Sequence, residues 1–212
     1  MVNSKMISSL TAENLACTRG ERTLFSALNF RVQAGQALAV EGANGAGKTS
    51  LLRLIAGFLA PVAGRIVIKI GTDENDDAEA RGKSVGWLGH QDGLKPQLTV
   101  AEQLDFFAGL YRSRADASVL EQVGLDRQAD LPCRYLSAGQ RRRLALARLL
   151  VSQRALWLLD EPFAALDTSG QRLMAHVMAR HCGDGGIIIA ATHEPLGLGN
   201  DIVRLANESL KL

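Results

Sequence analysis

Cysteine, long apolar runs and a secretory leader are scarce or absent in this sequence. Only three of the 212 residues are cysteines, and no two have the C-x-x-C spacing typical of zinc sites and redox motifs. No apolar run approaches the ~18 residues that a membrane span needs, and the first residues, MVNSKMISSL, lack the apolar core of a signal peptide. We therefore expect a cytosolic chain, at most peripheral to a membrane, whose cysteines only pack: Cys17, Cys133 and Cys182.

Strong charge and internal repetition are also absent. A formal net charge of +2 and a pI near 8.5 are too mild to indicate a nucleic-acid surface. The basic cluster from Arg141 to Arg143 falls in a helical pattern, and we interpret it as a solvated helix face. Without an internal repeat, a tandem duplication is excluded. A chain of 212 residues with 47% hydrophobic content fills one domain, with or without a subdomain.

A glycine-rich octapeptide is the most informative segment of the chain. GANGAGKT, from Gly42 to Thr49, fits the phosphate-binding loop pattern G-x-x-x-x-G-K-[ST], and an apolar strand before it and a helical run after it give the required context. The loop amides and the helix N-terminus form an anion site, Lys48 reaches the β/γ oxygens, and the Thr49 hydroxyl can ligate Mg²⁺. The predicted ATP-binding residues are Gly42, Ala43, Asn44, Gly45, Ala46, Gly47, Lys48, Thr49 and Ser50.

A second motif, ALWLLDEP, is an apolar strand that ends in two adjacent carboxylates. We expect this strand to lie beside the strand of the phosphate-binding loop. Asp160 would then hold a water on Mg²⁺, and Glu161, which points elsewhere, would be the general base for the attacking water. Two acidic residues after a strand are, alone, more often a solvated strand end. The phosphate-binding loop is what favours a hydrolase.

The remaining pattern predicts an α/β fold of the P-loop NTPase class with an antiparallel β flank. The acidic stretch 71–82 is expected to be a solvated loop without chemistry. From Thr99 the apolar residues recur at helical spacing, and a second helix follows through Leu125. A later helical stripe makes His176 and His181 surface or packing residues rather than metal ligands. The strands of the flank are predicted at 7–15, 28–32 and 64–70.

Two further motifs point to a family. LSAGQRRR begins at Leu136, and Thr192-His193 follows another apolar strand. Taken in order with the phosphate-binding loop and the paired carboxylates, they make the chain resemble the ATP-binding cassette ATPases of membrane transporters over nearly its whole length. The resemblance implies a single ATP-binding domain, 1–212. Its core would cover about 1–91 and 154–212, and a helical subdomain of about 92–153 would contact the membrane partner.

The resemblance also implies a role for each motif. Gln91 takes the Q-loop position, 164–167 the D-loop position, and His193 that of the switch histidine, which acts in catalysis with Lys48 and Glu161. The implied magnesium ligands are Thr49, Gln91 and Asp160. In a head-to-tail homodimer, the signature of one copy would close over the ATP of the other, because its helix N-terminus can meet a γ-phosphate. The signature residues are Leu136, Ser137, Ala138, Gly139 and Gln140.

Within this family, the wording of several sequence segments resembles that of one group of transporter ATPases. GHQDGLKPQLTVAEQL, the signature alanine Ala138, GGIIIAATHEPL and the short tail after His193 are similar to ATP-binding subunits of the haem exporter used in bacterial cytochrome c maturation. That likeness implies a membrane-embedded haem exporter permease, a periplasmic haem chaperone downstream, and a peripheral place on the cytoplasmic face of the bacterial inner membrane. The chain has no C-x-x-C-H haem motif, and we interpret His90 as part of the coupling loop.

The sequence departs from the general cassette pattern at two positions. Arg19 stands before Gly20 where the family usually has an aromatic residue that stacks on adenine, and a guanidinium-on-ring contact can replace that stack. Ala164 stands where many cassettes have a D-loop serine, which we expect to loosen the link between the two ATP sites.

Three other functions remain open. An ATPase of a transporter for another substrate would share all of these motifs. A soluble relative acting on ribosomes or DNA would carry tandem cassettes or a long basic coiled coil, and this sequence has neither. A nucleotide switch that organises a membrane assembly without turnover would not need the full set of Lys48, Asp160, Glu161 and His193.

Overall fold

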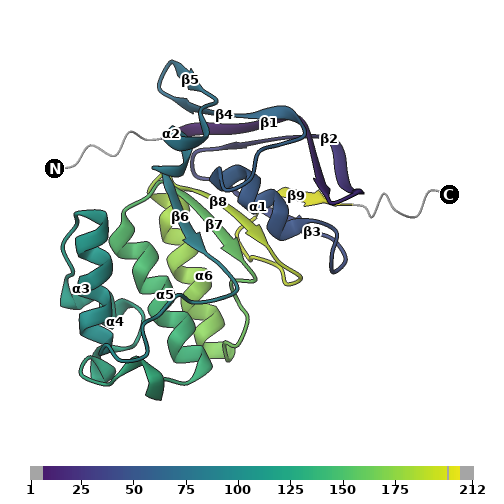
Figure 1. The fold of residues 1–212 in the computed structure, drawn as a ribbon. Helices are drawn as coiled ribbons and strands as arrows, with labels where there is room; N and C mark the ends of the chain where they lie inside the picture. The colour runs from purple at the N-terminus through teal and green to yellow at the C-terminus, as the bar shows by residue number, and fades with distance from the viewer. Residues whose placement is uncertain (1–6, 200, 206–212) are drawn as a thin grey trace.

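Two β-sheets organise the chain, which a computed structural model describes over residues 7–199 and 201–205 (Figure 1). Residues 1–6, which belong to the N-terminal segment without signal-peptide character, lie outside the described residues. The antiparallel sheet contains, in spatial order, β2 (Arg22–Gln33), β1 (Ile7–Arg19), β4 (Ala63–Ile70) and β5 (Asp73–Asn75). The parallel sheet contains β6 (Val85–Leu88), β7 (Leu156–Asp160), β8 (Ile187–Ala191), β3 (Ala37–Glu41) and β9 (Asp201–Arg204).

The antiparallel sheet confirms the predicted β flank, with longer strands than the sequence indicated. A tight turn at Gly20 pairs Arg19 with Arg22 and joins β1 to β2. Between β1 and β4 the register shifts near Glu13, where the backbones approach closely. A Cβ atom on Gly64 would lie only 2.3 Å from the Glu13 carbonyl oxygen, so this position requires glycine.

The order of the parallel sheet corrects one expectation. The strand that ends in Asp160 does not lie beside the strand of the phosphate-binding loop, because β8 lies between β7 and β3. The three isoleucines of β8 are fully buried, each stabilising the fold by roughly 1.5–3 kcal/mol, and such an apolar strand takes a central place in a parallel sheet. Asp160 still lies at the same end of the sheet as the phosphate-binding loop, because Ala191 pairs with both Asp160 and Val40.

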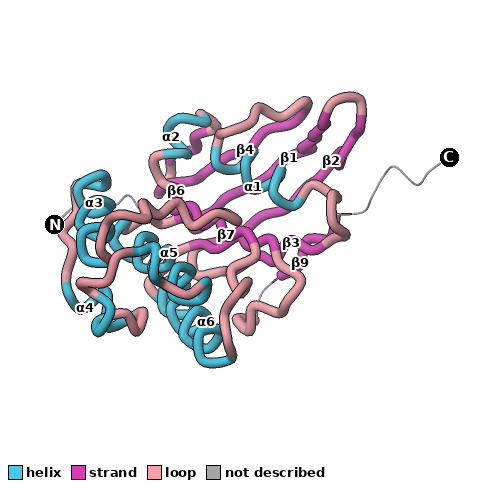
Figure 2. Tube along the Cα trace, turned by 60° about the horizontal axis from the view of Figure 1, so that its bottom comes forward, coloured by secondary structure: helices cyan, strands magenta, loops and turns pink. Residues whose placement is uncertain are grey.

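The parallel sheet lies between two hydrophobic cores. Along β7, Leu156 and Leu158 pack toward α1 (Lys48–Ala56) and the antiparallel sheet, whereas Trp157 and Leu159 pack on the opposite side. The opposite core is formed with α3 (Val100–Tyr111), α4 (Ala117–Gln122), α5 (Ala138–Ser152) and α6 (Thr168–Gly183). These four helices gather on one side of the molecule and α1 lies on the other (Figure 2).

Capping explains where the longer helices begin. Thr99 starts α3 and Ser137 starts α5 with the same capping box, in which the hydroxyl accepts from the amide three residues on and the Glu102 or Gln140 side chain accepts from the cap amide. The predicted helix after Thr99 is confirmed, and a second helix follows as predicted but ends at Gln122, before Leu125. Within residues 7–199 and 201–205, no helix has the length and apolar character needed to cross a lipid bilayer.

The acidic stretch 71–82 is more structured than expected. It contains β5 and a short helix, α2 (Ala78–Gly82), which Asp77 caps. Arg81 is buried at 4% exposure and donates to the carbonyl oxygens of Ile55 and Ile66. The carboxylates of the stretch are exposed as predicted. The prediction of a loop was wrong because it weighed the charges and overlooked the single arginine that anchors the segment.

The basic cluster on α5 also differs from the prediction of a solvated face. Arg142 is only 3% exposed, while Arg141 and Arg143 beside it are half-buried. Arg142 precedes the buried Leu146 and Leu149 by four and seven residues, so that it lies on the helix face that packs into the core. The helical period, rather than the run of like charges, decides where its side chain points.

The cysteines pack as expected, and of the two histidines one lies at the surface and the other packs in the core. Cys17 and Cys133 are buried and Cys182 is half-buried, and burial raises the pKa of each thiol. His176 is exposed on α6, and His181 stacks on Trp157 with ring centroids 3.8 Å apart. Among the described residues, no group of three or more His, Cys, Asp or Glu side chains is arranged to hold a metal ion.

Candidate active site

The phosphate-binding loop joins β3 to α1, as the motif predicts. Gly42, Gly45 and Gly47 have φ angles of 155°, 80° and 103°, which L side chains rarely adopt. A Cβ atom on Gly42 would lie 2.8 Å from the carbonyl oxygen of Leu205. Within the described part of the chain no side chain caps α1, whose N-cap is Gly47. Its first amides are therefore available to an anion.

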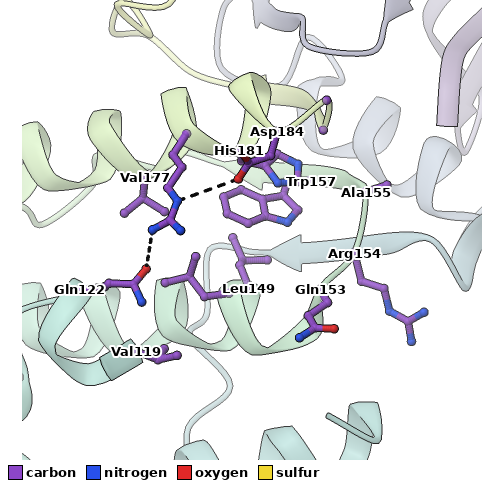
Figure 3. Close-up of a pocket in the computed structure, with 14 residues that line it drawn as sticks. Val119, Gln122, Leu149, Gln153, Arg154, Ala155, Trp157, Val177, His181 and Asp184 are labelled. Carbon is purple, nitrogen blue, oxygen red and sulfur yellow. Dashed lines mark hydrogen bonds and ion pairs between the residues drawn. The ribbon is translucent and has the colours of Figure 1, made fainter. Parts of the chain in front are cut away.

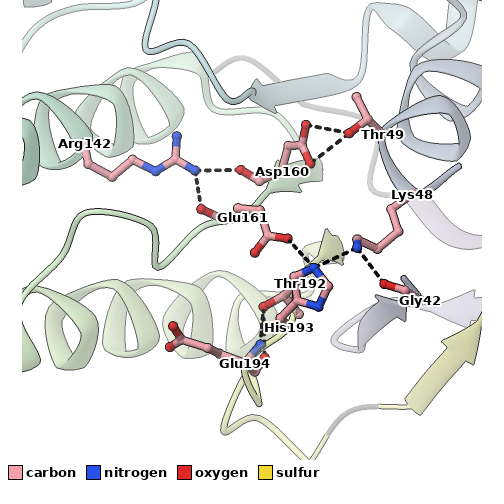
Figure 4. Close-up of polar contacts among 9 residues, drawn as sticks. All are labelled: Gly42, Lys48, Thr49, Arg142, Asp160, Glu161, Thr192, His193 and Glu194. Atoms are coloured by element: carbon pink, nitrogen blue, oxygen red, sulfur yellow. Dashed lines mark hydrogen bonds and ion pairs between the residues drawn. The ribbon is translucent and has the colours of Figure 1, made fainter. Parts of the chain in front are cut away.

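Lys48 is nearly buried at the start of α1, with 8% of its surface exposed. Its ammonium donates to the Gly42 carbonyl oxygen at 2.7 Å and lies 2.9 Å from Nε2 of His193 (Figure 4). This bond to the first residue of the loop holds the cation beside the loop backbone. A phosphate in the loop would meet a positive charge that is already in position.

Asp160 and Thr49 meet at the carboxyl end of β7. The Thr49 hydroxyl, on α1, contacts both carboxylate oxygens of Asp160, at 3.0 and 3.2 Å (Figure 4). Asp160 is 7% exposed. One carboxylate and one hydroxyl that face a phosphate loop match the oxygen donors that Mg²⁺ takes beside nucleotide phosphates.

Glu161 points away from Asp160 toward His193. Its backbone has a φ of 49°, in the left-handed region, and its amide donates to the Ala191 carbonyl oxygen at 2.8 Å. Its Oε1 lies 3.5 Å from Nε2 of His193 (Figure 4). Thr192 and Glu194 fix the loop of His193, since the Thr192 hydroxyl accepts from the Glu194 amide at 2.9 Å.

Lys48, Thr49, Asp160 and Glu161 line a cleft of about 330 Å³ at the carboxyl ends of the parallel strands, and His193 contacts Lys48 without lining it. Such a position is where ligands bind in open α/β sheets. Arg19 contributes to the wall from the end of β1. The residues around the cleft are Arg19, Leu24, Ala43, Asn44, Gly45, Gly47, Lys48, Thr49, Ser50, His90, Asp160 and Glu161.

Several predicted residues lie elsewhere, and others were missed. Of the described residues, His90 lines the cleft and the neighbouring Gln91 does not; Gln91 is exposed on the loop after β6. The signature 136–140 lies at the start of α5 and also contributes nothing to the cleft of its own chain. Leu24 and Arg142 were not predicted near the site. The burial period of α5 would have found Arg142, whereas no sequence signal indicates Leu24.

A second cavity of about 330 Å³ lies at the opposite, amino ends of the strands (Figure 3). It is bounded by α4, α5 and α6, with Trp157 and His181 stacked in its wall. Arg180 spans its rim, bonded to Gln122 at 3.3 Å and 3.9 Å from Asp184. Burial lowers the pKa of His181 to about 4, so that the ring is neutral at physiological pH. The predicted packing role of His181 is confirmed.

Comparison with known proteins decides the family. A family model described as ABC transporter matches residues 25–164. The cytochrome c biogenesis ATP-binding export protein CcmA of Rhodopseudomonas palustris (strain BisB5) is 50% identical over 199 residues, which cover 92% of this chain and 97% of that protein. The chain belongs to the ABC transporter family. Within the family it is an ATP-binding cassette ATPase.

Two further relatives agree with this membership. The protein of the same description from Rhizobium etli (strain ATCC 51251) is 49% identical over 197 residues, covering 90% of this cassette ATPase and 91% of the relative. A solved ATP-binding cassette, in a dimeric post-hydrolysis state bound to ADP and Pi, superposes with a TM-score of 0.78 at 23% identity. The superposition covers 93% of this chain and 94% of the solved cassette. The superposition confirms the predicted fold class.

Proposed function

We propose that this cassette ATPase is the ATP-hydrolysing subunit of a complex that exports haem, or releases a loaded haem chaperone, in c-type cytochrome biogenesis. The relatives described as cytochrome c biogenesis export proteins support this, since the first is 50% identical over 97% of its own length. The subunit would be peripheral on the cytoplasmic face of the bacterial inner membrane. The helical segment of about 92–153 would contact a haem exporter permease, with a periplasmic haem chaperone downstream.

The observation that carries the catalytic part is the convergence of five groups from three distant segments. Lys48 lies 2.9 Å from His193, His193 lies 3.5 Å from Glu161, and Asp160 meets Thr49 beside them. In our proposal the loop amides and Lys48 bind the ATP phosphates. Glu161 takes a proton from the attacking water as that water bonds to the γ-phosphorus, and ADP leaves. His193 steadies the γ-phosphate.

Mg²⁺ fits the donor set of this site. The Thr49 hydroxyl and the Asp160 carboxylate already converge within 3.0 Å, and Gln91 is the third ligand that we propose. When bound, Mg²⁺ neutralises the charge that develops on the β- and γ-phosphate oxygens. The chain's own contribution is to place two oxygen donors of different charge at one end of the sheet.

A homodimer completes the site in this proposal. Ser137 and Ala138 are exposed at the start of α5, away from the cleft of their own chain, which leaves them available to another molecule. Two copies in head-to-tail arrangement would bring Ser137 and Gly139 of one onto the ATP held by Lys48 of the other. Closing of the dimer is then the step that does mechanical work on the membrane partner.

Haem staining of c-type cytochromes tests the proposal. In cells that lack this gene, we expect covalent haem attachment to vanish, to return with the normal protein, and to stay absent with Glu161→Gln. Immunoblots with matched levels of both proteins provide the control. Haem attachment that persists without the gene would assign the ATPase to a transporter for another substrate. Restoration by Glu161→Gln would instead indicate a nucleotide switch that needs no turnover.

A further inference from the structure

A buried guanidinium lies behind the two carboxylates and has no part in the mechanism above. Arg142 extends from the second turn of α5, and 3% of its surface is exposed. Its contacts account for all five N–H groups of the side chain. The acceptors are the carbonyl oxygens of Asp160 (2.7 Å), Glu161 (2.6 Å), Gly89 (2.8 Å) and Pro162 (3.4 Å) and the carboxylate of Asp92 (3.3 Å).

Two of these bonds hold the backbone on either side of the Glu161 α-carbon. The carbonyl oxygens of Asp160 and Glu161 both accept from Nη2 of Arg142 (Figure 4). Between them the backbone of Glu161 has a φ of 49°, which a residue other than glycine seldom adopts. Fixing the peptide on each side of this residue fixes the direction in which its Cα–Cβ bond leaves the backbone. The side chain then extends toward His193, with Oε1 3.5 Å from Nε2.

The same guanidinium reaches a second segment of the site. Nη1 bonds Gly89 and Asp92, which flank His90 and Gln91 in the loop after β6. The Asp92 carboxylate, 21% exposed, is the acidic partner of the buried charge. One side chain on the signature helix therefore joins the loop after β6 to the loop after β7. Lysine, with three donors on a single nitrogen, can reproduce only part of this arrangement.

We infer that Arg142 is a positioning residue, which holds Glu161 in the left-handed conformation that aims its carboxylate at the attacking water. The inference rests on the proposed role of Glu161 as general base. Arg142 contributes no group to the cleft itself, since its contacts are with the backbone behind the site and with Asp92. Its loss should therefore lower kcat and leave the affinity for ATP nearly unchanged.

The first test compares Arg142→Met and Arg142→Lys with the normal full chain. We expect kcat to fall roughly 10- to 100-fold in Arg142→Met, a part of the ~10²–10⁴-fold contribution of a general base. Arg142→Lys should recover part of that loss. The dissociation constant for ATP should change less than about twofold in both. If ATP affinity and the melting temperature of Arg142→Lys fall in step with kcat, the side chain is only structural and the inference fails.

A double-mutant cycle gives the decisive readout. In a Glu161→Gln background, Arg142→Met should cause no further loss, because the group that it positions is already gone. Single-turnover assays with radiolabelled ATP reach the slow rates required. A further 10- to 100-fold loss would overturn the inference. If Arg142→Met does not fold, Arg142→Lys takes its place in the cycle, and a normal kcat in that variant is equally contradictory.

Arg148 supplies the matched control on the same helix. It donates to the carbonyl oxygens of Asp92 and Trp87, at 2.8 and 2.9 Å, so that it anchors the loop after β6 without a bond to Glu161. The effect of Arg148→Met should therefore be the same in both backgrounds. If Glu161→Gln alone leaves ATP turnover normal, the proposed role of Glu161 as general base is refuted. That outcome differs from a further loss in the double variant, which would refute only the positioning role of Arg142.

Discussion

The two ends of the parallel sheet hold cavities of the same volume, about 330 Å³, but different residues line them. The cleft at the carboxyl ends is lined by the phosphate-binding loop and the start of α1, contains two cations and two carboxylates, and has positive φ angles at Gly45, Gly47 and Glu161. The cavity at the amino ends lies between helices, with a stacked Trp157 and His181 in its wall. Volume alone therefore does not identify the functional cavity.

The histidines of the two ends show the same contrast. His193 keeps 53% of its side chain exposed and contacts Lys48 and Glu161. His181 is packed on an aromatic ring, and burial lowers its pKa to about 4. Histidine therefore makes polar contacts at one end of the strands and packs in the core at the other. The position of the residue in the fold, rather than its type, determines which of these two roles it has.

The largest expected effect separates the two ends directly. Glu161→Gln should lower ATP turnover by about 10²–10⁴-fold, the usual range for a general base, while ATP binding is retained. Asp184→Asn, in the opposite cavity, should leave turnover unchanged. Phosphate release and ATP titration of the two variants make the comparison. Equal effects of the two substitutions would remove the distinction between the ends.

The next prediction concerns the signature at the start of α5. Ser137→Ala should lower turnover roughly 10²-fold, the loss seen when a donor to developing charge is removed, without changing the ATP affinity of an isolated monomer. It also removes a helix cap, at a cost of about 1 kcal/mol. Thr99→Ala removes the same kind of capping box from α3 and should cost similar stability with normal turnover. Full activity of Ser137→Ala would rule out a composite site.

The pH dependence of stability sharpens the contrast at the amino ends. Because the folded-state pKa of His181 is about 4 and the unfolded value is 6.5, the unfolded chain binds more protons between these values. The stabilising contribution of the neutral ring is complete above pH 6.5 and is lost as the pH falls toward 4. At 1.36 kcal/mol per pKa unit it amounts to up to about 3 kcal/mol.

Urea unfolding of His181→Phe between pH 4 and 7 measures this contribution. The variant should show a flatter pH profile than the normal protein, whereas His176→Asn, exposed on the same helix, should keep the normal profile. A His181→Phe profile as steep as that of the normal protein would show that His181 is not the group that titrates.

The smallest expected effect lies at the edge of the ATP cleft. Arg19→Ala should raise the KM for ATP by about two- to fivefold, because an exposed cation–π contact contributes about 0.5–1 kcal/mol. Arg19→Tyr, which restores an aromatic ring, should return the KM to normal or below. Steady-state kinetics measure the KM for ATP of both variants. An unchanged KM in Arg19→Ala would exclude a base contact by this residue.

The contrast between the ends also shows what the sequence could predict. The phosphate-binding loop has a fixed spacing, and its strand-loop-helix context and Lys48 were found where predicted. The strand order was not predictable, because β7 and β8 are both wholly buried apolar strands of five residues and either could lie beside β3. Arg142 was misplaced because three like charges in sequence suggested a solvated face. The helical period, which buries Arg142 with Leu146 and Leu149, overrides that suggestion.

Hydrogen–deuterium exchange of the Glu161→Gln protein, with and without Mg²⁺ and ATP, tests the central claim most directly. If the cleft at the carboxyl ends binds the nucleotide, peptides that cover 42–50 and 160–161 should exchange more slowly with ATP. Peptides that cover 117–122 and 181–186, around the cavity at the amino ends, should be unchanged. Protection at 181–186 without protection at 42–50 would contradict the account.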